Sequence, residues 1–357
     1  MIFDPESIAR DNIKRLVSYS SARHEFAGDA EIFLDANENA FGSPVKEQLN
    51  RYPDPLQTAL KEKVAELKGV DPAQIFLGNG SDEAIDLLFR IFCEPGRDDV
   101  IICPPTYGMY KVAADINDVS IKEISLTPDF QLDVPRVRKG ITPRTKLIFI
   151  CSPNNPTGNA MNRDDILGIA ADFNGIVVVD EAYIDFSSKR SMIDKIGNHP
   201  KLVVLQTFSK AWGLAGARVG MAFAGETIIA LFNRVKPPYN ISQLSQDTVL
   251  AALDNEIKVK TWIEEIIEQR LSLTDAMSEL EFVETVYPSD ANFLLVKMSD
   301  AFAVYRFLLD KRIVVRDRSN VRLCDGCLRV TVGTPEENGR LLFALQTFEK
   351  NQLRKSI

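Results

Sequence analysis

Short apolar segments rich in Val and Ile recur between residues 70 and 225, and loops or helical stretches separate them. They span residues 74–77, 100–103, 146–151, 176–179 and 202–205, and a helical pattern over 82–92 follows the first. Because the segments are apolar on both faces, they are typical of parallel strands covered by helices on each side. The pattern predicts an α/β fold with a mostly parallel central sheet, whose ligands bind at the carboxyl ends of the strands.

The C-terminal part of the chain has a different pattern. A long helical stretch over residues 255–283 precedes a strand at 291–297, a helix at 301–309 and strands at 313–316 and 328–332. This order is typical of a smaller α+β unit. We expect a large domain over residues 46–254 and a small domain over 255–357. The N-terminal arm, residues 1–45, is expected to pack with the small domain.

Composition narrows the possible partners and compartments. The formal net charge of −8 over 357 residues argues against nucleic acid, because phosphate binding favours a basic surface. The apolar runs are far shorter than the ~20 residues that cross a bilayer, and no basic leader with an apolar segment opens the chain. Five scattered cysteines fit a reducing, cytoplasmic setting. The sequence predicts a cytoplasmic protein without a membrane partner.

The histidines and cysteines offer little for metal or triad chemistry. Only His24 and His199 are present, and neither has the spacing of a hydrolase triad or of a metal site. Cys324 and Cys327 form a single CxxC around Asp-Gly, which suits a tight hairpin turn better than zinc. We therefore expect no metal, and a lysine or a carboxylate as the base of any catalysed reaction.

Small and polar residues follow the first predicted strand, where a turn leads into the helix. They include Gly80, Ser81 and Asp82. Glycine lets the backbone approach a ligand, and free amides at a helix N-terminus favour a phosphate. Glu83 stands where the dinucleotide-binding pattern needs its third glycine, which excludes that pattern. Alone, the segment fits an anion site and a plain capped turn equally well.

Two further strands end in side chains that could bind a ligand. Asn155 lies in the loop 151–158, which two prolines and a glycine keep out of helix and strand. Taken without its neighbours, this loop fits a turn with self-bonded Asn side chains better than a binding site. Asp180 ends the apolar run 176–179, so its carboxylate requires a cation if it is buried. The alternative for Asp180 is a cap on the next helix.

Residues 207–220 carry the strongest signal. Thr207, Ser209, Lys210 and Arg218 lie there among Gly and Ala residues, directly after a predicted strand. Small residues let a bulky group lie against the backbone, whereas a surface lysine on a flexible loop, the alternative, does not need them. Phosphate donors, an acid, an amide and an amine at the strand ends of one sheet form the set that pyridoxal phosphate requires.

These motifs resemble those of the fold-type I pyridoxal-phosphate aminotransferases over nearly the whole chain. The resemblance rests on Asn155-Pro156-Thr157-Gly158, Asp180-Glu181-Ala182-Tyr183 and Ser209-Lys210, with Arg218 eight residues further on. Within this group the chain is most similar to the histidinol-phosphate aminotransferase family. That similarity lies in residues 19–23, 34–38, 51–54, 104–110 and 328–334.

The resemblance implies roles toward the cofactor, pyridoxal 5′-phosphate. Lys210 would bind it covalently and then move a proton between the substrate Cα and the cofactor, while Asp180 would pair with the ring nitrogen. Asn155 and Tyr183 would contact the ring oxygen, and Tyr107 would stack on the ring. The cofactor phosphate would lie against Gly80, Ser81, Asp82, Thr207, Ser209 and Arg218. Tyr52 would reach the same phosphate from a partner subunit, which implies a homodimer.

The resemblance also implies the substrates. They are L-histidinol phosphate and 2-oxoglutarate, converted to imidazole-acetol phosphate and L-glutamate in a step of histidine biosynthesis. Arg329 would clamp the substrate anion, because a guanidinium grips a carboxylate or a phosphate with two hydrogen bonds. Further candidates for the substrate pocket are Asn155, Arg316, Arg340 and Tyr19. An aromatic amino-acid aminotransferase, a threonine-phosphate decarboxylase and a cofactor-binding regulatory protein remain alternatives.

Overall fold

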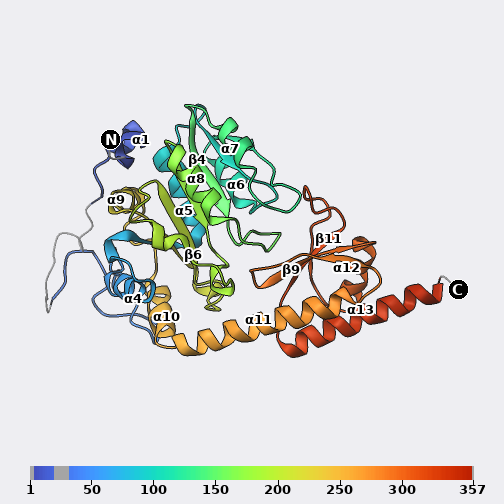
Figure 1. The fold of residues 1–357 in the computed structure, drawn as a ribbon. Helices are drawn as coiled ribbons and strands as arrows, with labels where there is room; N and C mark the ends of the chain where they lie inside the picture. Colours follow the sequence, from blue (N-terminus) through green and yellow to red (C-terminus); the bar gives the residue numbers. More distant parts are fainter. Residues whose placement is uncertain (1–3, 20–31, 356–357) are drawn as a thin grey trace.

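The computed structural model describes residues 4–19 and 32–355, which carry two β-sheets joined by a long helix (Figure 1). The larger sheet has seven strands in the order β1-β7-β6-β5-β4-β2-β3. Their bounds are β1 (Ile75–Asn79), β2 (Asp99–Ile102), β3 (Ser120–Glu123), β4 (Thr145–Cys151), β5 (Ile176–Asp180), β6 (Leu202–Thr207) and β7 (Val219–Phe223). Strands β6, β5, β4, β2 and β3 are parallel, and β7 is antiparallel to both β1 and β6.

The predicted α/β fold with a mostly parallel sheet is therefore confirmed. Each of the five apolar segments forms a strand, whereas β3 and β7 were not predicted. Strand β3 has no fully buried residue, so its sequence lacks the apolar run of the other strands. Strand β7 is buried throughout, but its sequence follows the Gly- and Ala-rich loop and contains Gly220. It therefore lacks the continuous Val- and Ile-rich run by which the other strands were predicted.

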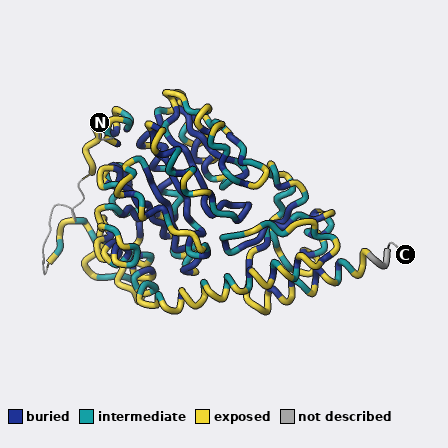
Figure 2. Tube along the Cα trace, viewed as in Figure 1, coloured by how far each residue is buried: buried dark blue, intermediate teal, exposed yellow. Residues whose placement is uncertain are grey.

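Helices cover both faces of the large sheet, and alternate residues of a strand point to opposite cores. In β4, Leu147 and Phe149 contribute to one core, and Ile148 and Ile150 to the other. Helices α5 (Gly80–Phe92), α6 (Met109–Ile116) and α9 (Glu226–Val235) pack on the first face. The second face is covered by α4 (Thr58–Lys68), α7 (Val134–Gly140), α8 (Arg163–Asp172) and α10 (Gln243–Leu253). Figure 2 shows the buried strands between these more exposed layers.

The smaller sheet is antiparallel, in the order β10-β11-β9-β8. Its strands are β8 (Val283–Val286), β9 (Phe293–Met298), β10 (Arg316–Asp317) and β11 (Cys327–Thr331). One face packs against α11 (Glu256–Ser278), α12 (Ala301–Asp310) and α13 (Pro335–Lys355). On the other face, Phe293, Leu295 and Cys327 join the core that also contains Ile150 and Tyr183 of the large unit. The face of the small sheet that carries Leu295 is thus turned toward the strand ends of the large sheet.

Helix α11 links the two units, because it contributes to both cores. Val259, near its start, packs with the large unit, and Leu273 and Met277 pack with the small sheet (Figure 1). The two predicted helices and the strands expected at 291–297 and 328–332 form close to the expected positions, as α11, α12, β9 and β11. The strand expected at 313–316 is instead the two-residue β10, and β8 was not predicted. The division at residue 254 stays a prediction. Among the described residues, no helix is both long enough and apolar enough to cross a bilayer.

The beginning of the chain packs differently from the expectation. Helices α1 (Pro5–Ile8) and α2 (Asp11–Lys14) lie against the large unit and not against the small sheet. Ala9 and Ile13 are buried in the core formed with α5 and α9, and the amide of Arg10 donates to the carbonyl of Ile91 at 2.9 Å. Ala9, at the end of α1, and Ile13, in α2, are the apolar residues that this segment packs against α5 and α9.

Candidate active site

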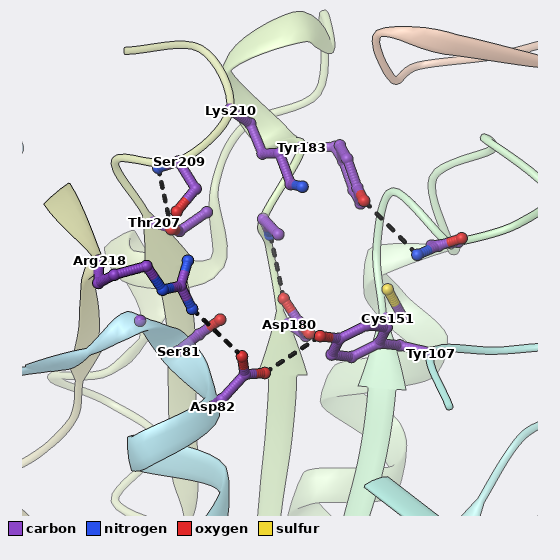
Figure 3. Close-up of a pocket in the computed structure, with 13 residues that line it drawn as sticks. Ser81, Asp82, Tyr107, Cys151, Asp180, Tyr183, Thr207, Ser209, Lys210 and Arg218 are labelled. Atoms are coloured by element: carbon purple, nitrogen blue, oxygen red, sulfur yellow. Dashed lines mark hydrogen bonds and ion pairs between the residues drawn. The ribbon is translucent and has the colours of Figure 1, made fainter. Parts of the chain in front are cut away.

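A pocket lies at the carboxyl ends of β4, β5 and β6 (Figure 3). Because these strands are parallel, their last residues Cys151, Asp180 and Thr207 meet at the same edge of the sheet. The pocket is completed by the start of α5 and the loop between β6 and β7. Its lining residues are Gly80, Ser81, Asp82, Tyr107, Cys151, Asn155, Asp180, Ala182, Tyr183, Thr207, Ser209, Lys210 and Arg218.

Asp180 forms the buried end of the pocket, with 3 % of its surface exposed. Its Oδ2 accepts a hydrogen bond from the Tyr110 hydroxyl at 2.7 Å, and its Oδ1 accepts one from the Ala182 amide at 3.1 Å. Burial raises the pKa of Asp180 above its ordinary value, while these two donors and the charge of Lys210 favour the ionised form. The carboxylate is thus suited to a cationic group inside the pocket.

Lys210 follows β6, and its amine points into the pocket (Figure 3). The Nζ atom lies 5.6 Å from the centre of the Tyr183 ring, and among the described residues it has no hydrogen bond or ion pair. Partial burial of the amine lowers the pKa of Lys210, and the positive charge of Arg329 lowers it further. A lysine with a lowered pKa and no competing partner is prepared to act as a nucleophile.

The start of α5 and the loop before β7 form an anion cradle. Gly80 has a left-handed backbone with φ +69°, and its amide donates to the carbonyl of Arg218 at 2.7 Å. The Arg218 guanidinium lies 3.6 Å from Asp82 Oδ2. The hydroxyls of Ser81 and Ser209 have no hydrogen-bond partner within the described part of the chain, so they are available to a ligand. Together with the free amides of α5, these groups favour a phosphate.

Gly220 brings β7 against this cradle. A Cβ atom at Gly220 would lie 2.2 Å from the Ser81 amide nitrogen and 2.3 Å from the Gly80 carbonyl carbon. Only a residue without a side chain allows β7 to approach the first turn of α5 so closely. The geometry of the cradle therefore depends on Gly220, which was not among the predicted phosphate-binding residues.

Aromatic and amide side chains line the remaining wall. Tyr107 donates to Asp82 Oδ1 at 3.1 Å, and the Asn155 amide lies 3.5 Å from the Tyr183 hydroxyl. Arg329 of β11 donates to Asn155 Oδ1 and reaches the pocket from the small sheet. The charge of Arg329 favours the ionised form of Tyr183, although burial raises the pKa of that phenol overall.

The structure separates the other predicted substrate residues from the pocket lining. Arg316 lies opposite Arg329 in the β10–β11 pair and is exposed. Arg340, on α13, lines another hollow, together with Glu337 and Asn338. Tyr19 is 74 % exposed in a hollow beside α9, and the neighbouring residues 20–23 of its motif lie outside the described residues. The structure therefore brings only Arg329 of these candidates into contact with a pocket residue.

Tyr52 also lies away from the pocket of its own chain. Half of its surface is exposed, and its ring stacks on Tyr239 with the ring centres 4.5 Å apart. The amide of Tyr52 donates to Glu38, which also pairs with Arg51 at 2.7 Å. An ordered and exposed aromatic side chain of this kind is available for contact with a second molecule.

Several residues of the site were not predicted from the sequence. Cys151 and Ala182 line the pocket, and Tyr110, which is not part of the lining, donates a hydrogen bond to Asp180. Tyr110 lies on the first turn of α6 and within the motif 104–110 that supports the family resemblance, so its place in that motif was a usable signal. The contact between Gly220 and α5 has no such signal, because it depends on how two distant segments pack.

Comparisons with known proteins agree with this arrangement. The family described as aminotransferase class I and II matches residues 34–345. A histidinol-phosphate aminotransferase of Cytophaga hutchinsonii is 51% identical over 348 residues, which is 98% of this chain and 100% of that protein. The same enzyme of Parabacteroides distasonis is 52% identical over 346 residues, covering 97% of this chain and 99% of that protein.

A solved structure shares the fold at lower identity. The histidinol-phosphate aminotransferase of Sinorhizobium meliloti, in complex with pyridoxal-5′-phosphate, superimposes with a TM-score of 0.78 at 22% identity. The match covers 89% of this chain and 90% of that chain.

Proposed function

Since this chain belongs to the class I and II aminotransferases, and within them to the histidinol-phosphate aminotransferase family, we propose that it transfers the amino group of L-histidinol phosphate to 2-oxoglutarate. The products are imidazole-acetol phosphate and L-glutamate. The observation that carries the proposal is the position of Lys210 and Asp180 in one pocket, beside an anion cradle. The enzyme would act in histidine biosynthesis, in the cytoplasm.

The residues of the pocket fit pyridoxal 5′-phosphate. The cofactor needs an amine for its aldehyde, an acid for its ring nitrogen and donors for its phosphate. Lys210, Asp180 and the group formed by Ser81, Ser209 and Arg218 supply these three functions from the lining of a single pocket. When bound, the cofactor withdraws electrons from the substrate Cα and so weakens its C–H bond.

Each of the chain's own residues has a separate task in this proposal. Lys210 binds the cofactor and moves the proton at the substrate Cα, which its lowered pKa supports. Asp180 keeps the ring nitrogen protonated. Asn155 and Tyr183 hold the ring oxygen, and Tyr107 packs on the ring face. Thr207, Gly80 and Asp82 belong to the cradle for the phosphate, and Ser81 and Asp82 would bind it through their backbone amides.

Arg329 is proposed as the clamp for the substrate anion. It contacts Asn155, and its Cζ lies 5.2 Å from the centre of the Phe293 ring, so the guanidinium is held on two sides. A fixed, planar fork can bind a phosphate monoester in one half-reaction and a carboxylate in the other. Arg316, the residue paired with Arg329 between β10 and β11, is the next candidate for the substrate pocket, and Arg340 and Tyr19 are the others.

The active unit is proposed to be a homodimer in which Tyr52 reaches the cofactor phosphate of the partner subunit. The exposure of Tyr52 and its stacking on Tyr239 support this role, since the side chain is ordered but does not line its own pocket. A Tyr52→Ala variant should be complemented by mixing with a Lys210→Ala variant, because a mixed dimer would retain one intact site.

Assays with three amino donors test the substrate proposal. We expect 2-oxoglutarate-dependent turnover of histidinol phosphate, with phenylalanine used at most weakly. Preference for phenylalanine would favour the aromatic amino-acid aminotransferase instead. Release of carbon dioxide from threonine phosphate would identify a decarboxylase, and lack of turnover with all three donors would favour a regulatory, cofactor-binding role.

A further inference from the structure

Tyr110 is fully buried behind the pocket and bonds directly to Asp180. It lies on the first turn of α6, and its hydroxyl donates to Asp180 Oδ2 at 2.7 Å. The exposed fraction is 0% for Tyr110 and 3% for Asp180, so water does not compete for this hydrogen bond. A hydrogen bond to a carboxylate at such a site is stronger than one between neutral groups.

Two aromatic neighbours fix the ring of Tyr110. It stacks on Phe149 of β4, with ring centres 4.8 Å apart and an interplanar angle of 19°. It also meets the ring of Tyr107 edge-on, at 5.6 Å and 86°. Since both ring contacts are made by the carbon skeleton, a Tyr110→Phe change removes the hydroxyl and leaves the packing in place.

The hydroxyl has an electrostatic effect on Asp180. Burial raises the pKa of Asp180, and the Tyr110 hydroxyl opposes this rise most strongly, followed by the amide of Ala182. Two charged groups also act on Asp180: Asp82 disfavours its ionised form, and Lys210 favours it. Without the hydroxyl, Oδ2 would be a buried oxygen with no protein donor among the described residues.

We propose that Tyr110 is a positioning residue, which keeps the Asp180 carboxylate ionised and oriented toward the ring nitrogen of the cofactor. The inference rests on the proposed role of Asp180 toward pyridoxal phosphate, but it does not depend on which amino donor the enzyme uses. The alternative is that Tyr110 stabilises the fold through the packing of its ring, and that Asp180 only serves its buried hydroxyl as a hydrogen-bond acceptor.

A double-mutant cycle separates the two roles. The four apoenzymes are wild type, Tyr110→Phe, Asp180→Asn and the double variant, and each is titrated with pyridoxal phosphate to obtain a dissociation constant. We expect Tyr110→Phe to raise this constant about tenfold when Asp180 is present, and less than about twofold when Asn replaces it. An equal rise in both backgrounds would contradict the proposal, because the hydroxyl would then act without the carboxylate.

Steady-state kinetics give a second readout. Tyr110→Phe should lower kcat about tenfold, while KM for the amino donor stays within about twofold, since the hydroxyl does not face the substrate. Tyr287→Phe is the matched control: its ring meets Phe130 edge-on at 5.1 Å, and it does not line the pocket. This control should leave both the dissociation constant and kcat unchanged.

The cycle also covers a folding defect. If Tyr110→Phe alone fails to fold, the double variant should fold again, because Asp180→Asn removes the buried charge that lost its donor. Failure of both variants would contradict the proposal. Normal cofactor affinity and turnover in Asp180→Asn would instead contradict the proposed role of Asp180 itself. Normal Tyr110→Phe beside an impaired Asp180→Asn would overturn only the inference about Tyr110.

Discussion

Arg329 donates a hydrogen bond to Asn155, although 174 residues separate the two in the sequence. Arg329 belongs to β11 of the small sheet, and Asn155 lies in the loop that follows β4 of the large sheet. The contact brings a guanidinium of the small sheet to the cofactor pocket. Burial of this guanidinium lowers the pKa of Arg329, and the like charge of Arg316 adds to the effect. An incoming anion would relieve this repulsion.

Arg329→Ala should therefore lower kcat/KM for both substrates. Loss of a charge-assisted contact of roughly 2–3 kcal/mol corresponds to a decrease of about 30- to 150-fold in kcat/KM. We expect this decrease for histidinol phosphate and for glutamate, measured in the two half-reactions. Arg329→Lys should rescue poorly, because a single ammonium cannot form two parallel hydrogen bonds.

Arg322→Ala provides the control for Arg329→Ala. Arg322 pairs on the surface with Ser125 at 2.7 Å and with Glu123 at 3.9 Å, and such exposed pairs contribute at most about 1 kcal/mol. Its removal should leave both half-reactions unchanged. If Arg329→Ala impairs only one substrate, Arg329 is not the shared clamp, and Arg316 becomes the better candidate.

Asp180→Asn should slow turnover by about 100-fold, equivalent to about 2.7 kcal/mol in the barrier. The reason is that the amide cannot keep the ring nitrogen protonated, although it retains the size of the carboxylate. Cofactor affinity should fall by a smaller factor than kcat. The comparison requires kcat at saturating cofactor. Turnover near that of the wild type would mean that Asp180 serves only as an acceptor for the Tyr110 hydroxyl and the Ala182 amide.

Gly220→Ala should reduce cofactor affinity although Gly220 is not a binding residue. The added methyl group would meet the Ser81 amide at 2.2 Å, so β7 or the first turn of α5 must shift. We expect a lower thermal midpoint and at least a tenfold weaker binding of pyridoxal phosphate, because the cradle loses its geometry. Gly225→Ala is the matched control, since nothing lies within 4 Å of its added methyl group. If both variants bound pyridoxal phosphate equally well, the close approach of β7 to α5 would not determine cofactor affinity.

Glu181 gives the stability of the apoenzyme a distinctive pH dependence. It is buried, with hydrogen bonds from the Met192 amide, Ser191 and Gln206, and burial raises its pKa from 4.5 to about 7. Between these two values the folded protein binds more protons than the unfolded chain. The contribution of Glu181 to stability therefore falls as the pH rises through this window.

Glu181→Gln removes this titration. Between pH 5 and pH 7.5 the thermal midpoint of the wild type should fall relative to that of the variant. The change should correspond to at most a few kcal/mol of unfolding free energy. Thermal unfolding of the two apoenzymes across this range measures the effect. Parallel curves for the two proteins would show that Glu181 does not titrate there.

The sequence predicts β1, β2, β4, β5 and β6 of the large sheet and the loops after them, for a physical reason. Buried parallel strands need continuous apolar runs, and the polar residue that ends each run must face a ligand or a cap. Asp180 is recognisable because it follows such a run directly, and Lys210 because it lies in the loop of small and polar residues after the next run. This local pattern specifies the sheet edge without any knowledge of tertiary packing.

Tertiary packing determines the features that the sequence left open. Tyr110 contacts Asp180 across 70 residues, and no local pattern marks that pair. The sequence placed Arg329 in a predicted strand but could not show where that strand points, and β11 directs Arg329 toward Asn155, whereas Arg340 lines another hollow. The start of the chain packs on the large unit because Ile13 is buried against apolar residues of that unit. The sequence around Ile13 does not show which surface will bury it.

Lys210→Ala should abolish transamination while the cofactor still binds without a covalent bond. The phosphate cradle and Asp180 remain, so a dissociation constant should be measurable by titration. The absorbance band of the covalently bound cofactor should be absent. A variant that keeps this band and its turnover would require a different lysine.

The most direct test is to identify the lysine that carries the cofactor. Two other lysines compete on chemical grounds, because burial lowers the pKa of both Lys61 and Lys236 to about 8. The amine of Lys236, however, donates to three carbonyl oxygens, including that of Pro55 at 2.7 Å, whereas that of Lys210 faces the pocket. After borohydride reduction and digestion, mass spectrometry should find the cofactor on the peptide that contains Lys210. Attachment to Lys61, Lys236 or any other lysine would contradict the account.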